Sequence, residues 1–579
     1  MDYYPTIESL ALISDRNTCA ILDKNATINW YSPKRFDDSS VFHSLLDSKS
    51  GGSWEIITSA SLESRNFIDR SSVLEQNFVG GDDQFTLRDW MPIHKSYRGI
   101  VRQFSSSKHN IHSQIKMTPD YGRGQADITR INDQTVLFEN TGLYLFVSVP
   151  IQISGEMVGF SIPAGTGGWA YLTDLQTPDV WEDDFFESML TITLENWSDI
   201  ASEFEYEGLY QTEVLNAVRG IQQLTCGATG GVIAAATTSL PEVIGAERNY
   251  DYRYVWVRDA ALITGALSAL EVSGKVEEKF LEFMYESMRK NTGQCVYPLY
   301  TIDNNIIEDL TELELDGYQR SRPVQIGNIA SDQRQLDAEA NILISSKIIY
   351  DKYGRKTHWE MVRRVANYIC ENWHKPENGI WEEGAELQYT SGKVFSVIGL
   401  EMISRYSDDE QEKSYWQATA KKIRKYVGHN CMTSYGAFAN YAGSEEVDVS
   451  SALYVLWNYT LADSPEMLAT IDRLEQHHSR DNLYWRTLVE FDASKEGAFL
   501  AGSCWIAHYY AVAGNYEKSA QILDSVKSYQ NDLGYFAEEA DVDNKCQLGN
   551  FNQTFVQSSF ICAANGLSRE KEGVDTVVR

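Results

Sequence analysis

The sequence predicts a multi-domain protein of β and α structure, an antiparallel β-sandwich followed by a barrel of paired helices. The chain has 579 residues, too many for one compact core, so two or three domains are expected. Its first part is rich in β-branched and aromatic runs separated by glycine pairs, whereas apolar residues further on recur at helical spacing. With 43% hydrophobic and 12% aromatic residues, the chain can bury both cores.

Residues 1–180 are predicted to form the β-sandwich. The runs Cys19–Asp23 and Thr27–Tyr31 flank a polar turn, and Leu143–Pro150 is a dense β-branched and aromatic stretch. Pairs of adjacent glycines mark turns at 51–52, 80–81 and 167–168. Short strands joined by such turns favour an antiparallel sandwich.

The period changes to helical near residue 213, and residues 213–579 are predicted to form the helical barrel. Examples of the predicted helices are Gln333–Tyr353, Trp359–Trp373, Val394–Tyr406, Tyr415–Val427, Leu453–Leu461, Phe499–Val512 and Tyr516–Tyr529. Antiparallel pairs of such helices can close into an α/α barrel, with functional loops at one end. Residues 181–212 are predicted to be a helical linker between the two parts.

The charge, the apolar runs and the cysteines bear on the partners and location of the protein. A formal net charge of −32 is unsuited to nucleic acid or an anionic membrane, and it suits a neutral substrate. No apolar run approaches the ~18 residues of a membrane span, and no secretion signal is visible. The eight cysteines form no Cys-x-x-Cys or Cys/His cluster, so reduced thiols are expected and a structural zinc site is not. The sequence therefore predicts a soluble, cytoplasmic protein that binds no metal.

Two distant turns each end in adjacent glutamates, Gly379–Glu383 and Gly534–Glu539. A pair of carboxyl groups from separate segments is what hydrolysis of a glycosidic bond requires, since one protonates the leaving oxygen and the other activates a water or attacks the sugar. Adjacent acids near the start of a helix also suit the helix dipole. Spacing alone leaves both interpretations open.

A third stretch, Tyr250–Asp259, places aromatic residues around an Arg-Asp pair. Arg258 and Asp259 begin a strongly apolar helix, where they could hydrogen-bond sugar hydroxyls with Trp256 and Tyr252 beside them. The competing interpretation is an acid at a helix N-terminus next to a surface arginine.

The run Ala235–Glu242, continued by Tyr250–Ala260, strongly resembles glycoside hydrolase family 15, the family of glucoamylases and of some microbial trehalases. Further matches are Ser321–Asn328, Glu496–Leu500 and Leu548–Phe551. The segment from Trp30 to Gly52 is similar to the β-domain that precedes the barrel in prokaryote-type members. The resemblance covers nearly the whole chain.

The resemblance implies an (α/α)6 catalytic barrel that needs no metal or cofactor. It implies that Glu382 is the general acid and that Glu538 is the base that activates the attacking water. Such inverting hydrolysis requires the two carboxyl groups ~6.5–9.5 Å apart.

The resemblance also implies a subsite for the glucose whose bond is cut. Its predicted residues are Tyr252, Trp256, Arg258, Asp259, Trp381 and Glu383. Two departures from the starch-degrading members, Arg320 and Arg486, are predicted to lie near the departing sugar.

The sequence therefore predicts an inverting, exo-acting α-glucoside hydrolase that releases glucose from non-reducing ends, glucoamylase-like, acting on a small oligosaccharide or disaccharide. The stated alternatives are an α,α-trehalase and an isomaltose-type glucohydrolase. An alternative of another class is a catalytically silent sugar-binding protein, which the presence of both glutamates disfavours. The oligomeric state is not predicted.

Overall fold

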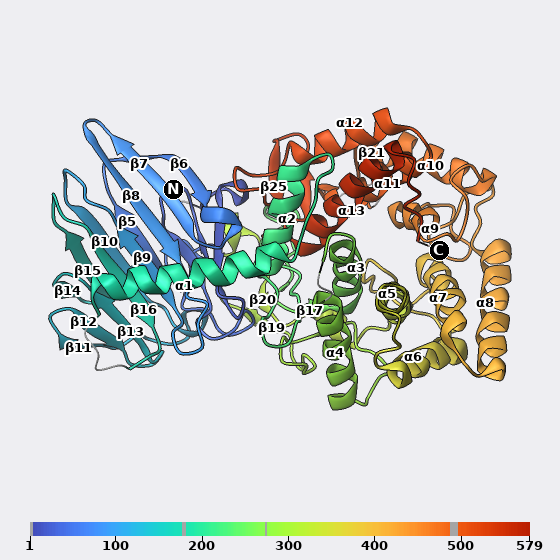
Figure 1. The fold of residues 1–579 in the computed structure, drawn as a ribbon, viewed down its shortest axis with the longest axis horizontal. Coiled ribbons are helices and arrows are strands. Elements are labelled where there is room, and N and C mark those ends of the chain that lie inside the picture. Colours follow the sequence, from blue (N-terminus) through green and yellow to red (C-terminus); the bar gives the residue numbers. More distant parts are fainter. Residues whose placement is uncertain (1–3, 177–180, 273–274, 487–495, 579) are drawn as a thin grey trace.

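The computed structural model describes residues 4–176, 181–272, 275–486 and 496–578. Two β-sheets occupy one end of the elongated molecule and a ring of helices occupies the other (Figure 1). The predicted fold class, an antiparallel β-sandwich followed by an (α/α)6 barrel, is confirmed by the elements given below.

Each N-terminal sheet has eight strands, and every pairing within it is antiparallel. The first sheet contains β1 (Ala11–Ser14), β2 (Cys19–Leu22), β3 (Ile28–Tyr31), β4 (Phe42–His43), β5 (Ser53–Ile57), β10 (Ile111–Lys116), β14 (Ile151–Ser154) and β15 (Met157–Ile162). The second contains β6 (Ser61–Phe67), β7 (Leu74–Gly80), β8 (Asp83–Trp90), β9 (Ile100–Phe104), β11 (Ile128–Asn132), β12 (Thr135–Phe138), β13 (Leu143–Val147) and β16 (Gly168–Thr173). We call β1–β16 the N-terminal sheets.

A buried ion pair within the second sheet also contacts the first sheet. Arg102 of β9 donates to Asp89 of β8 at 2.7 Å, and both side chains are fully buried. The same guanidinium lies over the ring of Trp54 in β5, 5.1 Å from its centroid, and donates to the Trp54 carbonyl oxygen. This arginine therefore ties the two sheets together within an otherwise apolar core.

Helix α1 (Asp183–Ser202) fills most of the predicted linker and runs along the N-terminal sheets (Figure 1). Phe186, Met189 and Leu190 recur at helical spacing and form its buried stripe. They pack against Trp169 and Tyr171 of β16. The linker is therefore held against the second sheet by an apolar contact.

The barrel consists, within the described residues, of six inner and six outer helices that alternate along the chain. The inner helices are α3 (Val257–Ser268), α5 (Leu336–Tyr353), α7 (Thr390–Ile403), α9 (Ala452–Leu456), α11 (Leu500–Val512) and α13 (Thr554–Lys571). The outer helices are α2 (Gln211–Gln223), α4 (Lys275–Lys290), α6 (Trp359–Asn372), α8 (Glu410–Asn430), α10 (Pro465–His477) and α12 (Tyr516–Lys527). Inner helices such as α11 are buried on nearly all sides, whereas outer helices such as α6 bury a single stripe.

The predicted helices all correspond to observed ones, with ends that differ by up to five residues. The prediction Leu453–Leu461 is too long, because α9 ends at Leu456 and Asn458 adopts a positive φ of 59°. None of the helices in the described parts of the chain is long and apolar enough to cross a membrane.

Short strands stand beside the loops at one end of the barrel. They are β17 (Val255–Trp256), β18 (Leu299–Tyr300), β19 (Thr311–Leu313), β20 (Val324–Ile326), β23 (Ala498–Phe499), β24 (Glu539–Asp541) and β25 (Cys546–Leu548). The hairpin of β24 and β25 follows the turn Gly534–Glu539 and stands between Glu538 and α13.

Candidate active site

A cavity of 240 Å³ opens among these loops. Seven of the eight predicted site residues line it: Tyr252, Trp256, Arg258, Asp259, Trp381, Glu382 and Glu538. They come from the segment before α3 and the first turn of α3, from the turn before α7 and from the segment before β24, which are far apart in the sequence. The fold therefore gathers them in one place.

Glu382 lies in the turn between α6 and α7 in the left-handed conformation, with φ of +61°. Its Oε1 accepts hydrogen bonds from Trp256 Nε1 at 2.6 Å and from Arg258 Nη2 at 3.2 Å. Gln333 Nε2 donates to its backbone carbonyl at 3.0 Å. A non-glycine residue in this conformation stores strain that the surrounding contacts must offset, as is common at functional sites. The turn thus fixes the carboxyl group at the cavity wall.

Glu538 is almost completely buried, with 5% of its surface exposed. Tyr252 Oη donates to its Oε1 at 3.0 Å, while its Oε2 has no partner among the described residues. Gly549 packs against it at φ +82°, where a Cβ atom would stand 2.9 Å from Glu538 Cβ. Glu538 Oε2 is therefore a buried acceptor whose hydrogen-bonding capacity is not used by the described residues.

The pKa of Glu538 is raised to about 8, because burial disfavours its charged form. The negative charge of Glu242 adds to this rise, and the positive charge of Arg486 and the Tyr252 hydrogen bond oppose it. The ionisation of Glu538 therefore depends on its charged neighbours.

Tyr252 and Trp256 connect the two glutamates. Their rings meet edge to face with centroids 5.4 Å apart, and each ring carries a donor to a different glutamate. The neighbouring Tyr250 also lines the cavity. This aromatic surface can contact a sugar face between the two acids.

Arg258 and Asp259 stand in the first turn of α3, as predicted. Besides Glu382, Arg258 contacts Asp259 at 3.3 Å and the buried Asp337 at 3.4 Å. Burial raises the pKa of Asp259 to about 7, with Arg258 opposing and Glu382 adding to the rise. Sequence reasoning missed Asp337, since a lone aspartate in an apolar helix carries no distinctive motif.

Trp381 also lines the cavity. Its ring meets Phe499 edge to face at 5.1 Å and stacks on Trp505 at 6.1 Å. Its Nε1 donates to Asp448, and the Arg486 guanidinium lies 5.6 Å from its ring centroid. The indole is thus held on several sides.

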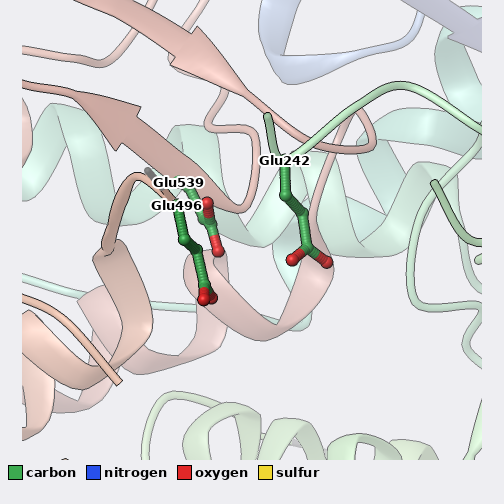
Figure 2. A group of neighbouring side chains, drawn as sticks. All are labelled: Glu242, Glu496 and Glu539. Carbon is green, nitrogen blue, oxygen red and sulfur yellow. The ribbon is translucent and has the colours of Figure 1, made fainter. Parts of the chain in front are cut away.

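Three buried glutamates beside the cavity, Glu242, Glu496 and Glu539, have carboxylate oxygens within 4.8 Å of one another (Figure 2). Such a spacing can hold a metal ion, but here Arg486 contacts all three, with distances of 2.8 Å to Glu242 and 2.7 Å to Glu539. Arg248 donates to Glu242 at 2.7 Å. We call these five residues the arginine–glutamate cluster. The guanidinium groups supply the charge that a cation would supply.

Sequence reasoning missed most of this cluster as a site. Glu242 and Glu496 lie within segments that carry the family resemblance, Ala235–Glu242 and Glu496–Leu500, so the signal was present in those segments. Arg486 was predicted near the departing sugar, and it does line the cavity.

Two predicted residues lie elsewhere. The side chain of Glu383 is exposed and does not line the cavity, so the predicted contact with the cleaved glucose has no support from its position. Arg320 is exposed on the 3₁₀ turn Tyr318–Arg320, also outside the cavity lining. The structure does not support its predicted place at the departing sugar.

Comparison with known proteins identifies the family to which the chain is similar. Residues 208–522 match the sequence model of glycosyl hydrolases family 15, and residues 2–150 match a model described as trehalase-like, N-terminal. Trehalase 1 of Sulfolobus acidocaldarius is 29% identical, over 98% of this chain and 100% of that protein. The trehalase of Thermoplasma volcanium is 27% identical over 95% and 92%, and that of Mycobacterium tuberculosis 26% over 99% and 91%.

Solved structures share the fold. A bacterial glucoamylase complexed with acarbose superposes with a TM-score of 0.72 at 13% identity, covering 98% of this chain and 95% of that one. A structure described as a wild-type glycosidase superposes with a TM-score of 0.51 at 16% identity, covering 62% of this chain and 99% of that one. At such low identity the likeness shows the fold alone.

Proposed function

Because this chain belongs to glycosyl hydrolases family 15, we propose that it is an α,α-trehalase, which hydrolyses trehalose to two molecules of glucose. One observation carries the choice of substrate: the three relatives reported above, which are 26–29% identical in sequence over more than nine tenths of the chain, are named trehalases. The N-terminal match to a trehalase-like model agrees with it. The proposal replaces the glucoamylase-like prediction with its stated alternative.

The size and lining of the cavity support a short substrate. Its 240 Å³ lies below the ~300–1,000 Å³ usual for small-molecule sites, so one or two sugar rings suit it better than a glucan chain. Arg258 and Asp259 stand beside Glu382, and the arginine–glutamate cluster stands beside Glu538. Polar groups near both acids can hydrogen-bond the hydroxyls of two glucose units.

We assign Glu382 as the acid that protonates the glycosidic oxygen. The carboxylate of Glu538 would take a proton from a water that attacks the anomeric carbon on the opposite face. The attacked glucose would leave as the β anomer, while the departing glucose would keep its α configuration. A covalent route through Glu538 would give two α anomers instead.

Sugar release by the purified protein tests the proposal. We expect the highest kcat/KM on trehalose among trehalose, maltose, isomaltose and maltotriose, with Glu382→Gln as the inactive reference. A preference for maltose and maltotriose would restore the glucoamylase-like prediction. Absence of release from all four sugars, with measurable sugar binding, would favour the silent sugar-binding protein.

A further inference from the structure

The segment Tyr250–Trp256 is an extended ribbon with two different faces. Its backbone pairs with the preceding segment, since Ser239 N donates to the Tyr250 carbonyl at 2.8 Å and Ala235 N to the Tyr252 carbonyl at 2.9 Å. Successive side chains of an extended chain point to opposite sides. Tyr250, Tyr252 and Trp256 line the cavity, so the alternation directs Asp251 and Arg253 away from it.

Arg253 is the main side chain on that other face, and it is completely buried. Its guanidinium makes a two-point contact with Asp251, at 2.9 and 2.7 Å, and its Nη1 donates to the Asp38 carbonyl at 2.9 Å. It also packs against two rings, 5.5 Å from the centroid of Trp30 and 5.6 Å from that of Tyr121. Asp38, Trp30 and Tyr121 all belong to the N-terminal sheets or their loops.

Asp251 also contacts a loop beside the cavity. Its Oδ2 accepts a hydrogen bond from Gly327 N at 3.2 Å, and its backbone carbonyl accepts one from Asn328 Nδ2 at 3.3 Å. Asn328 lines the cavity. A shift of Arg253 would therefore disturb both the ribbon and the neighbouring loop.

A second contact between the two parts holds the turn that leads to Glu538. Arg65 of β6 is completely buried and donates to both oxygens of Asp532, at 2.9 and 2.7 Å. Asn531 Nδ2 donates to the Leu10 carbonyl at 2.8 Å, and its Oδ1 accepts from Tyr535 N at 3.0 Å. The turn that leads to Glu538 is thus fixed to the N-terminal sheets.

We propose that the N-terminal sheets are part of the active-site architecture, where they position the hydrogen-bonded pair of Tyr252 and Glu538 through Arg253 on one side and Arg65 on the other. Arg253 and Arg65 are positioning residues, since neither lines the cavity. The inference rests on the proposed hydrolase function. The N-terminal sheets then contribute to catalysis, and the barrel alone does not hold the site in place.

Other contacts between the N-terminal sheets and the barrel hold neither the ribbon nor the Glu538 turn. Arg35 contacts Asp303 at 2.9 Å with both side chains partly exposed. Arg35 also contacts Asp37, the neighbour of Asp38, so the control variant changes Asp303 and leaves that contact in place. This pair joins the N-terminal sheets to the barrel without touching either segment. It supplies a matched control for a general loss of contact between the parts.

The pH profile can separate positioning from stability. Tyr252, Glu242, Glu539, Arg486 and Arg248 are the titratable and charged groups around Glu538. The Tyr252 hydrogen bond lowers the pKa of Glu538. Loss of that bond should raise this pKa and move the acid limb of kcat/KM to higher pH.

The groups around Arg253 are Asp251, Asp37, Tyr121 and Tyr254, and none of them lines the cavity. An effect of Arg253 on the acid limb should therefore act through Tyr252. In the Tyr252→Phe background, a change at Arg253 should then give no further shift.

The experiment compares Arg253→Lys, Arg253→Gln and Arg65→Gln with Asp303→Asn in the full chain, with trehalose as substrate. We expect the Arg253 variants to lose ~10–100-fold in kcat. Their acid limb should move up by about half to one pH unit. Arg65→Gln should give a smaller loss of the same kind, and Asp303→Asn should leave kcat and the acid limb of the pH profile unchanged. Arg253→Lys keeps the charge and is the milder variant if Arg253→Gln does not fold.

Two results would overturn the inference. One is an Arg253→Lys enzyme whose kcat and acid limb of the pH profile match those of the wild type. The other is a change at Arg253 that shifts the acid limb equally in the wild-type and Tyr252→Phe backgrounds. Failure of the proposed function looks different, because the wild-type protein itself would then release no glucose from trehalose. If maltose proves to be the substrate, the same comparison is made with maltose.

Discussion

The charge of Glu242 should control the pH at which the enzyme becomes active. Glu242 is buried, and its Oε1 lies 3.5 Å from Tyr252 Oη, which in turn lies 3.0 Å from Glu538 Oε1. The two carboxylate oxygens are therefore at most 6.5 Å apart, the sum of these two distances. Glu242→Gln removes the negative charge with little change in shape.

The size of the effect follows from Coulomb's law. Two unit charges 6.5 Å apart interact by about 2.5 kcal/mol at an effective dielectric constant of about 20. This energy corresponds to about 1.9 pKa units. The ionised form of Glu538 is the one that Glu242 destabilises, so its removal lowers the pKa of Glu538 from its raised value of about 8. We expect a fall of about 1–2 units.

A base must be ionised to accept a proton, so kcat/KM should rise with pH through the pKa of Glu538. The assay is the pH profile of kcat/KM on trehalose, which reports groups of the free enzyme. In Glu242→Gln the rising limb should move to lower pH. Glu247→Gln removes one charge from an exposed side chain of the same loop and should leave the limb in place.

An unchanged rising limb in Glu242→Gln would refute the electrostatic argument. A shift of the falling limb instead would mean that Glu538 must be protonated to act. The acid and base assignments of Glu382 and Glu538 would then have to be exchanged.

Four further predictions concern catalysis and stability. Glu382→Gln should fold normally but lose ~10²–10⁴-fold in kcat, because an amide cannot protonate the leaving oxygen, and Glu386→Gln on the same loop, with an exposed side chain, is the control. Fast NMR of the first products should detect equal α- and β-glucose from trehalose, and initial formation of α-glucose alone would exclude the inverting route. Asp259→Asn should lower kcat/KM on trehalose and on any other accepted glucoside by the same factor. Arg320 lies outside the cavity lining, so Arg320→Ala should leave kcat/KM on each sugar, and the ratio between the sugars, unchanged. Asp89→Ala should reduce the free energy of unfolding in urea by about 3–5 kcal/mol, since it leaves the buried Arg102 without its carboxylate, and a loss below about 1 kcal/mol would contradict this.

The fold class could be predicted because local patterns differ sharply between the two parts. Strand β3 is a compact apolar run, and α6 buries residues at helical spacing. Ends were less predictable, as at Leu456, where the backbone turns through a positive φ two residues later. The hairpin of β24 and β25 was missed because its three-residue strands are shorter than any periodic signal.

The site could be predicted in part because short motifs hold its residues. Tyr252, Trp256, Arg258 and Asp259 lie within one stretch of the sequence. The role of Arg253 could not be predicted, although it lies in the same stretch, because its partners Trp30 and Tyr121 are more than a hundred residues away. Only the folded chain brings them together.

The division of one ribbon into two faces explains why so many aromatic and charged residues are crowded between Tyr250 and Asp259. An extended segment that serves a cavity on one side needs a rigid support on the other, because a free ribbon would let Tyr252 and Trp256 move away from their glutamates. A buried guanidinium is suited to this task, since its planar fork contacts a carboxylate, a carbonyl and two rings at once. A lysine keeps the charge but cannot keep this geometry. The alternation of cavity-facing and supporting residues therefore ties the chemistry at Glu382 and Glu538 to the N-terminal sheets.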